Sequence, residues 1–231
     1  MVYFFHIFYS IFIYSLFFMH TYTPRTFTLG TLEGLSEEQI KVHLGLYEGY
    51  VKHMNVLREQ IAELTTLDAT KYAFAITETR RRLGFEFNGM RMHEYYFEQL
   101  EAIPNEGGSP DPSGSRGGAS PLSSDSKLAL AMTEKYGSVE GFMTHFKSVA
   151  MSRGIGWSIL YADPVGNTIH TAWVADHELG QLGGLPIIFA LDMWEHAFMV
   201  DYRPAEKKNY VEAFMANVNW SVVEKRFGEA S

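Results

Sequence analysis

The sequence has no cysteine among its 231 residues. This absence excludes disulfide bonds, thiolate zinc sites, iron–sulfur clusters and thiol catalysis. A transition-metal site in this chain must therefore use histidine, aspartate and glutamate, and nine histidines are present.

The chain also lacks a concentration of positive charge. It has 19 lysines and arginines against 27 aspartates and glutamates, a formal net charge of -8. No cluster of basic residues stands out, so the electrostatic footprint of a nucleic-acid-binding protein is absent. We expect no nucleic-acid partner, and the length suits one or two compact domains.

Residues 1–19 form an aromatic-rich apolar run of nearly membrane-spanning length. A secretory signal usually has a basic start and a small-residue cleavage site, whereas this run has neither a basic residue before Arg25 nor a clear site. The hydrophobic segment 1–25 is therefore a signal or anchor, a mis-assigned start or, least in keeping with its composition, part of the fold. We expect a cytoplasmic protein, or an exported or membrane-tethered one if the segment is a true signal or anchor.

Hydrophobic periodicity predicts the elements of the fold. Helical spacing predicts helices over about 36–64 and 68–100. Ser36 and Gln39 predict a capping box at the start of the first helix, and Gly89 predicts an interruption of the second. Residues 103–126 are rich in Gly, Ser and Pro, which predicts a linker.

The C-terminal half has a different pattern. Residues 126–152 predict two helices broken at 136–138, and 205–227 predict a helical tail. Runs at 156–161 and 168–174 predict a β-hairpin, and 187–191 predict a third strand. The sequence thus predicts an α+β fold: an N-terminal α-helical hairpin (26–102), the linker 103–126, and a C-terminal α/β domain (127–231) with a three-stranded antiparallel sheet.

Four residues are candidate metal ligands. Asp192 and His196 are four residues apart after the last predicted strand, so they converge if the chain turns helically. A buried carboxylate needs a partner, which a metal or a hydrogen bond to histidine would supply. His43 and His93 lie on core-facing sides of predicted helices, where a lone histidine is more often structural. Together, three histidines and one aspartate suit iron, manganese, cobalt or zinc.

The motifs around these residues resemble the iron/manganese superoxide dismutase family over about residues 30–227. Residues 192–198, DMWEHAF, and the following Asp201-Tyr202 resemble the family signature D-x-W-E-H-A-[FY] followed by D-Y. Weaker similarities lie at 50–55, YVKHMN, at 154–157, GIGW, and at 219–220, NW.

The resemblance implies an enzyme that converts superoxide to oxygen and hydrogen peroxide at one iron or manganese ion per chain, cycling between +3 and +2. It implies a homodimer or homotetramer with Glu195 and Tyr202 at the interface, and Tyr50 beside the substrate channel. The implied metal ligands are His43, His93, Asp192 and His196.

The chain departs from the family pattern in two places. His43 and Tyr50 are seven residues apart, where the family commonly has eight, so we expect a regular helix without a π-bulge. Gly89 replaces a glutamine that, in one branch, hydrogen-bonds the metal-bound water. In the other branch this donor comes from the C-terminal domain, where His177 is our candidate and Gln181 is the alternative. His177 could also be an ordinary exposed loop histidine. We expect iron, or tolerance of either metal.

Two other functions stay open. A relative that kept the fold but lost catalysis would be a structural or binding protein, although the intact ligand set argues against it. A metal hydrolase or an oxygen-activating iron enzyme would use the same residue types, but three histidines plus a carboxylate leave fewer open positions than a two-histidine, one-carboxylate triad.

Overall fold

A computed structural model describes residues 20–101 and 121–230. The described residues divide into two compact units, residues 20–24 with 47–90, and residues 25–46 with 91–101 and 121–230. The apolar run 1–19 and most of the predicted linker lie outside the described residues. Within the described ranges, no helix is both long and apolar enough to cross a membrane.

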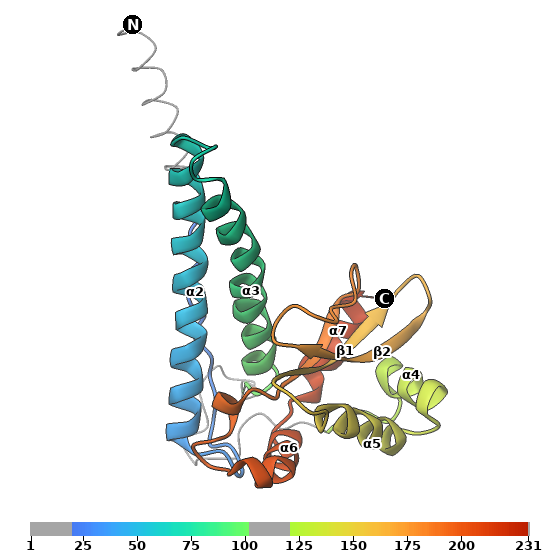
Figure 1. The fold of residues 1–231 in the computed structure, drawn as a ribbon. Coiled ribbons are helices and arrows are strands. Elements are labelled where there is room, and N and C mark those ends of the chain that lie inside the picture. The colour runs from blue at the N-terminus through green and yellow to red at the C-terminus, as the bar shows by residue number, and fades with distance from the viewer. Residues whose placement is uncertain (1–19, 102–120, 231) are drawn as a thin grey trace, which may run out of the picture. The chain divides into compact units, whose positions relative to one another are not determined.

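The two N-terminal helices are α2 (Glu37–Thr66) and α3 (Ala73–Glu98), and α2 is regular throughout, as the spacing predicts. They run side by side in Figure 1. Ser36 caps α2 by accepting a hydrogen bond from Gln39 N at 3.0 Å. The second half of the predicted capping box is wrong, because Ser36 N donates instead to Asp201 Oδ2 at 2.7 Å and the Gln39 side chain binds elsewhere.

The predicted interruption of α3 at Gly89 is also wrong, since the helix is continuous there. A Cβ atom at Gly89 would lie 2.5 Å from Tyr50 Cδ1, so the Tyr50 ring packs directly on the bare helix backbone. A glycine inside a helix costs about 1 kcal/mol relative to alanine. Packing of the tyrosine ring offsets that cost and leaves the helix intact.

The C-terminal sheet confirms the prediction of three antiparallel strands. They are β1 (Gly156–Asp163), β2 (Thr168–Ala175) and β3 (Ile187–Asp192), in the order β2-β1-β3. The central strand β1 is buried along almost its whole length. The C-terminal end of β1 leads into the turn at 164–167. At the opposite end of β1, Trp157 lies opposite Asp192 of β3.

Helices cover the sheet, as Figure 1 shows. Ser126 and Ser138 cap α4 (Lys127–Tyr136) and α5 (Val139–Ala150), and left-handed Gly137 separates them. The helical tail is two helices, α6 (Lys207–Ala216) and α7 (Trp220–Ala230). They are separated where the Asn217 side chain binds both N and O of Glu33, at 2.8 Å each.

Arg226 of α7 fastens the tail to the rest of the second unit. Its guanidinium donates to Tyr95 O at 3.1 Å and to Glu98 Oε2 at 2.7 Å, near the end of α3. It also reaches Gln99 Oε1 and Ile188 O at 3.3 Å each. The side chain is 9% exposed, so these donors replace water.

Replacing Arg226 by methionine should lower the free energy of unfolding by about 2 kcal/mol, because acceptors at the end of α3 lose a charged donor. Arg81→Met is the matched control, since Arg81 is 61% exposed and pairs with Glu78 in the neighbouring turn of the same helix. We expect that control to change stability by less than about 0.5 kcal/mol. Equal losses in urea denaturation would contradict the assigned role of Arg226.

Candidate metal centre

The fold brings the four predicted ligands to one point in the second unit. His43 comes from α2, His93 from α3, Asp192 from the end of β3, and His196 from the 3-10 turn Glu195–Ala197. Their Nε2 atoms lie 3.1, 3.5 and 3.4 Å from Asp192 Oδ2, for His43, His93 and His196 respectively. All four ligand atoms lie within 4.8 Å of one another.

The surroundings of this cluster are dry. The side chains of His43, His93 and Asp192 have no exposed surface, and His196 is 17% exposed. A carboxylate oxygen has about two lone-pair positions, yet three ring nitrogens surround Oδ2. The buried His196 Nε2 has no hydrogen-bond partner within the described part of the chain. A cation at the centre of the four atoms would satisfy this arrangement, so the residues fit a metal ion.

The electrostatics favour the protonation states that ligation needs. Burial opposes ionisation of Asp192, but the neighbouring His196 and His43 rings outweigh it and hold the pKa of this carboxyl well below its usual range. Burial lowers the pKa of His43, although Asp192 pulls the other way. An ionised carboxylate and neutral imidazole are the forms that bind metals.

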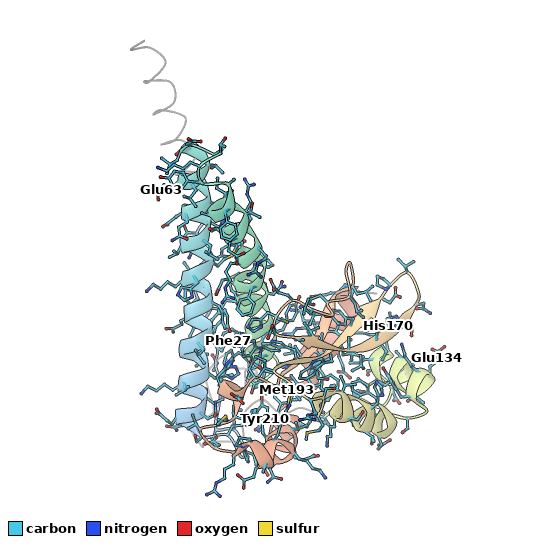
Figure 2. The ribbon with its side chains drawn as sticks, viewed as in Figure 1. Phe27, Glu63, Glu134, His170, Met193 and Tyr210 are labelled. Carbon is cyan, nitrogen blue, oxygen red and sulfur yellow. The ribbon has the colours of Figure 1, made fainter. Side chains whose placement is uncertain are left out.

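Asp192 is fixed on three sides. Its Oδ1 accepts from Trp194 N at 2.8 Å, which leaves Oδ2 aimed at the histidines. Its backbone carbonyl accepts from the buried hydroxyl of Tyr210 at 2.8 Å, and its register position opposite Trp157 sets its height in the sheet. Figure 2 labels Tyr210 and Met193, the residue that follows Asp192 in the chain.

Gln39 positions His196, the fourth candidate ligand, and the sequence prediction missed this role. Its Nε2 donates to His196 O at 2.7 Å, and its Oε1 accepts from Val200 N at 2.9 Å. The side chain is fully buried and one helical turn before His43. A polar residue on the core-facing side of a helix, next to a candidate ligand, was the available signal.

His177 lies in the core beside the cluster. Trp157 Nε1 donates to His177 Nδ1 at 2.9 Å, and the ring stacks on Trp194 at 4.9 Å between centroids. Its centroid is 6.1 Å from that of His93. Because the side chain is fully buried, it is not an exposed loop histidine.

Gln181, the alternative donor, faces a different set of partners. Its Oε1 accepts from Tyr161 OH at 2.6 Å, and its Nε2 is 3.3 Å from Met92 Sδ. That amide also lies 3.4 Å from His177 O, so it supports the loop that carries the histidine.

The other predicted residues lie as follows. Tyr50 belongs to the first unit, where it is half-buried against Gly89 and Phe85. Glu195 is exposed, and the Tyr202 hydroxyl donates to Gly34 O within the same chain.

The chain is similar to proteins of one family. Residues 124–226 match the model of the C-terminal domain of iron/manganese superoxide dismutases. The iron superoxide dismutase of Cupriavidus metallidurans is 34% identical, with 86% of this chain and 91% of the relative covered. That of Saccharolobus solfataricus is 31% identical, with 88% and 90% covered. The manganese superoxide dismutase of Mycolicibacterium paratuberculosis is 31% identical, with 82% of each covered. The chain belongs to the iron/manganese superoxide dismutase family.

Proposed function

We propose that this chain disproportionates superoxide to oxygen and hydrogen peroxide at one iron or manganese ion held by His43, His93, Asp192 and His196. One observation carries the proposal: three imidazole Nε2 atoms converge on Asp192 Oδ2 in a buried setting. One carboxylate offsets a single positive charge, so a divalent or trivalent ion leaves the site cationic. This local charge attracts an anion despite the net charge of -8.

When bound, iron or manganese supplies the one-electron chemistry and acidifies its water ligand. The protein's part is to shape a dry pocket around it. Trp157 packs edge-on against His93, with 5.2 Å between ring centroids, and the ring centroid of Tyr96 lies 4.8 Å from that of His43. Low local polarity strengthens every charge interaction at the centre.

His177 is the group that we assign to proton delivery. The indole N–H of Trp157 can only donate, so His177 Nδ1 must accept, and the ring hydrogen resides on Nε2. That nitrogen is then a hydrogen-bond donor, which is what a group that delivers protons needs. Tyr50 is proposed as a further proton relay, on the family resemblance alone.

The second donor position favours the same assignment. A side chain at residue 89 would collide with the Tyr50 ring, so a glutamine there would require the ring to move. His177 therefore takes over the donor function in this chain. We propose iron as the native metal, in keeping with the iron enzymes among the relatives.

We also propose a homodimer that forms over the face around Glu195. This carboxylate is exposed, and Met199 and Val200 beside it are 47% and 48% exposed. Exposed apolar side chains next to a charged residue are typical of a protein interface. Tyr202 would contribute through its ring, since its hydroxyl is bound to Gly34 O.

The purified, metal-loaded chain should accelerate superoxide dismutation far beyond the same amount of free metal. His177→Asn keeps an acceptor for Trp157 but removes the Nε2 donor, so activity should fall about 100-fold at unchanged metal content. His145→Asn, at an exposed histidine on α5, is the matched control. A wild-type chain no better than free metal would refute the proposed function, and an unaffected H177N variant would refute the role of His177.

Glu195→Ala should raise the dissociation constant of the proposed dimer at least tenfold. In the dimer this carboxylate would be covered by the second subunit, and its removal would leave its partner across the interface unpaired. Sedimentation velocity over a concentration series measures this change. Glu140→Ala, at an exposed carboxylate on α5, should leave the dissociation constant unchanged. A wild-type chain that sediments as a monomer throughout would contradict the interface.

A further inference from the structure

A second cluster of reactive side chains lies away from the metal centre, where α4 meets the β1–β2 hairpin. Lys135 is in the last turn of α4, His170 is on β2, and Asp163 ends β1. Lys135 Nζ is 3.2 Å from His170 Nδ1, and His170 Nε2 is 3.3 Å from Asp163 Oδ2. Figure 2 marks His170 on its strand and Glu134, the neighbour of Lys135, on α4.

These contacts fix the tautomer of the imidazole. A lysine ammonium group donates hydrogen bonds and accepts none, so His170 Nδ1 must be the acceptor. The ring hydrogen then resides on Nε2 and points at Asp163. The order is that of a nucleophile, a base and a carboxylate that orients the base.

Each end of the cluster is held in place. Asp163 Oδ1 accepts from Val165 N at 3.1 Å and from Gly166 N at 2.8 Å, which fixes the carboxylate in the hairpin turn. Lys135 Nζ also donates to Ile169 O, which holds the amine beside the ring. Lysine is otherwise a flexible side chain, so this placement is a feature of the fold.

The amine is also more readily deprotonated than an ordinary surface lysine. Partial burial lowers the pKa of Lys135, although the charge of Asp163 opposes the shift. The residue as a whole remains exposed. An incoming reagent can therefore reach it.

We propose that Lys135 is a self-activated acylation site that reacts with small acyl phosphates, with His170 as the general base. The amine nitrogen attacks the acyl carbon, an amide C–N bond forms, and the C–O bond to phosphate breaks. Phosphate leaves with the bonding electron pair. His170 Nδ1 takes the proton that the amine loses, Asp163 stabilises the resulting imidazolium, and the proton then passes to solvent.

Acylation changes the local structure in a definite way. It removes one positive charge and leaves a single N–H where the ammonium group had three. The amide therefore cannot keep both the Ile169 and the His170 contacts. The end of α4 would then be held less tightly to β2.

The full chain should be incubated with acetyl phosphate, and acetylation followed at each lysine by mass spectrometry. Lys41 and Lys225 are internal controls, since their side chains are 80% and 75% exposed and each pairs with a glutamate one turn away in its own helix. We expect Lys135 to be acetylated at least about tenfold faster than either control lysine. This factor is below the rate acceleration that a general base usually contributes. The same measurement with acetyl-CoA tests whether a thioester serves as donor.

His170→Asn retains an acceptor near the Nδ1 position but cannot take up a proton, so it should bring Lys135 to the rate of the two control lysines. Asp163→Asn should reduce the rate less. His145→Asn, whose ring packs on Tyr136, should leave it unchanged. Equal labelling of Lys135, Lys41 and Lys225 in the wild-type chain would overturn the proposal, as would a fast Lys135 in the H170N variant. Faster reaction with acetyl-CoA alone would overturn the acyl phosphate assignment.

Discussion

The candidate site depends on one physical constraint, which is that the buried carboxylate of Asp192 needs compensation for its charge. It is completely buried at the end of a core strand, where an unpaired charge would cost several kcal/mol. Three imidazole rings from three different segments surround it. A metal ion among them would turn that unfavourable carboxylate into a ligand, and the free energy of metal binding would add to the free energy of folding.

Much of the second unit serves to hold this carboxylate and its partners still. The β1–β3 register fixes the backbone of Asp192, Tyr210 binds its carbonyl, and Trp194 N turns its side chain. Gln39 does the same for His196 from α2. Helix α2, strand β3 and helix α6 are thereby linked through backbone groups of the segments that carry Asp192 and His196. The rigidity of the site therefore depends on the packing between these elements.

Part of the fold and of the candidate site could be predicted from the sequence because the signals are local. Asp192 and His196 share one short motif, and the three strands appear as apolar runs bounded by turn residues. The supporting contacts were beyond sequence reasoning for a physical reason. Gln39 fits a capping box locally, and only the tertiary position of Val200 and His196 gives its amide better partners. Gly89 predicts a helix break because glycine is a poor helix former, and the compensating contact with the Tyr50 ring is a tertiary one. Tyr210 has no sequence signal, since its hydroxyl partner is a backbone atom on another element.

The central claim is that these four side chains form one tight site for a redox metal. Elemental analysis of the purified full chain, beside an Asp192→Asn variant shown by circular dichroism to be folded, tests it most directly. The account predicts one iron or manganese ion per wild-type chain and less than about a tenth of that in the variant, since loss of the carboxylate charge weakens binding steeply. A well-folded wild-type chain without either metal, or equal metal content in both proteins, would contradict it.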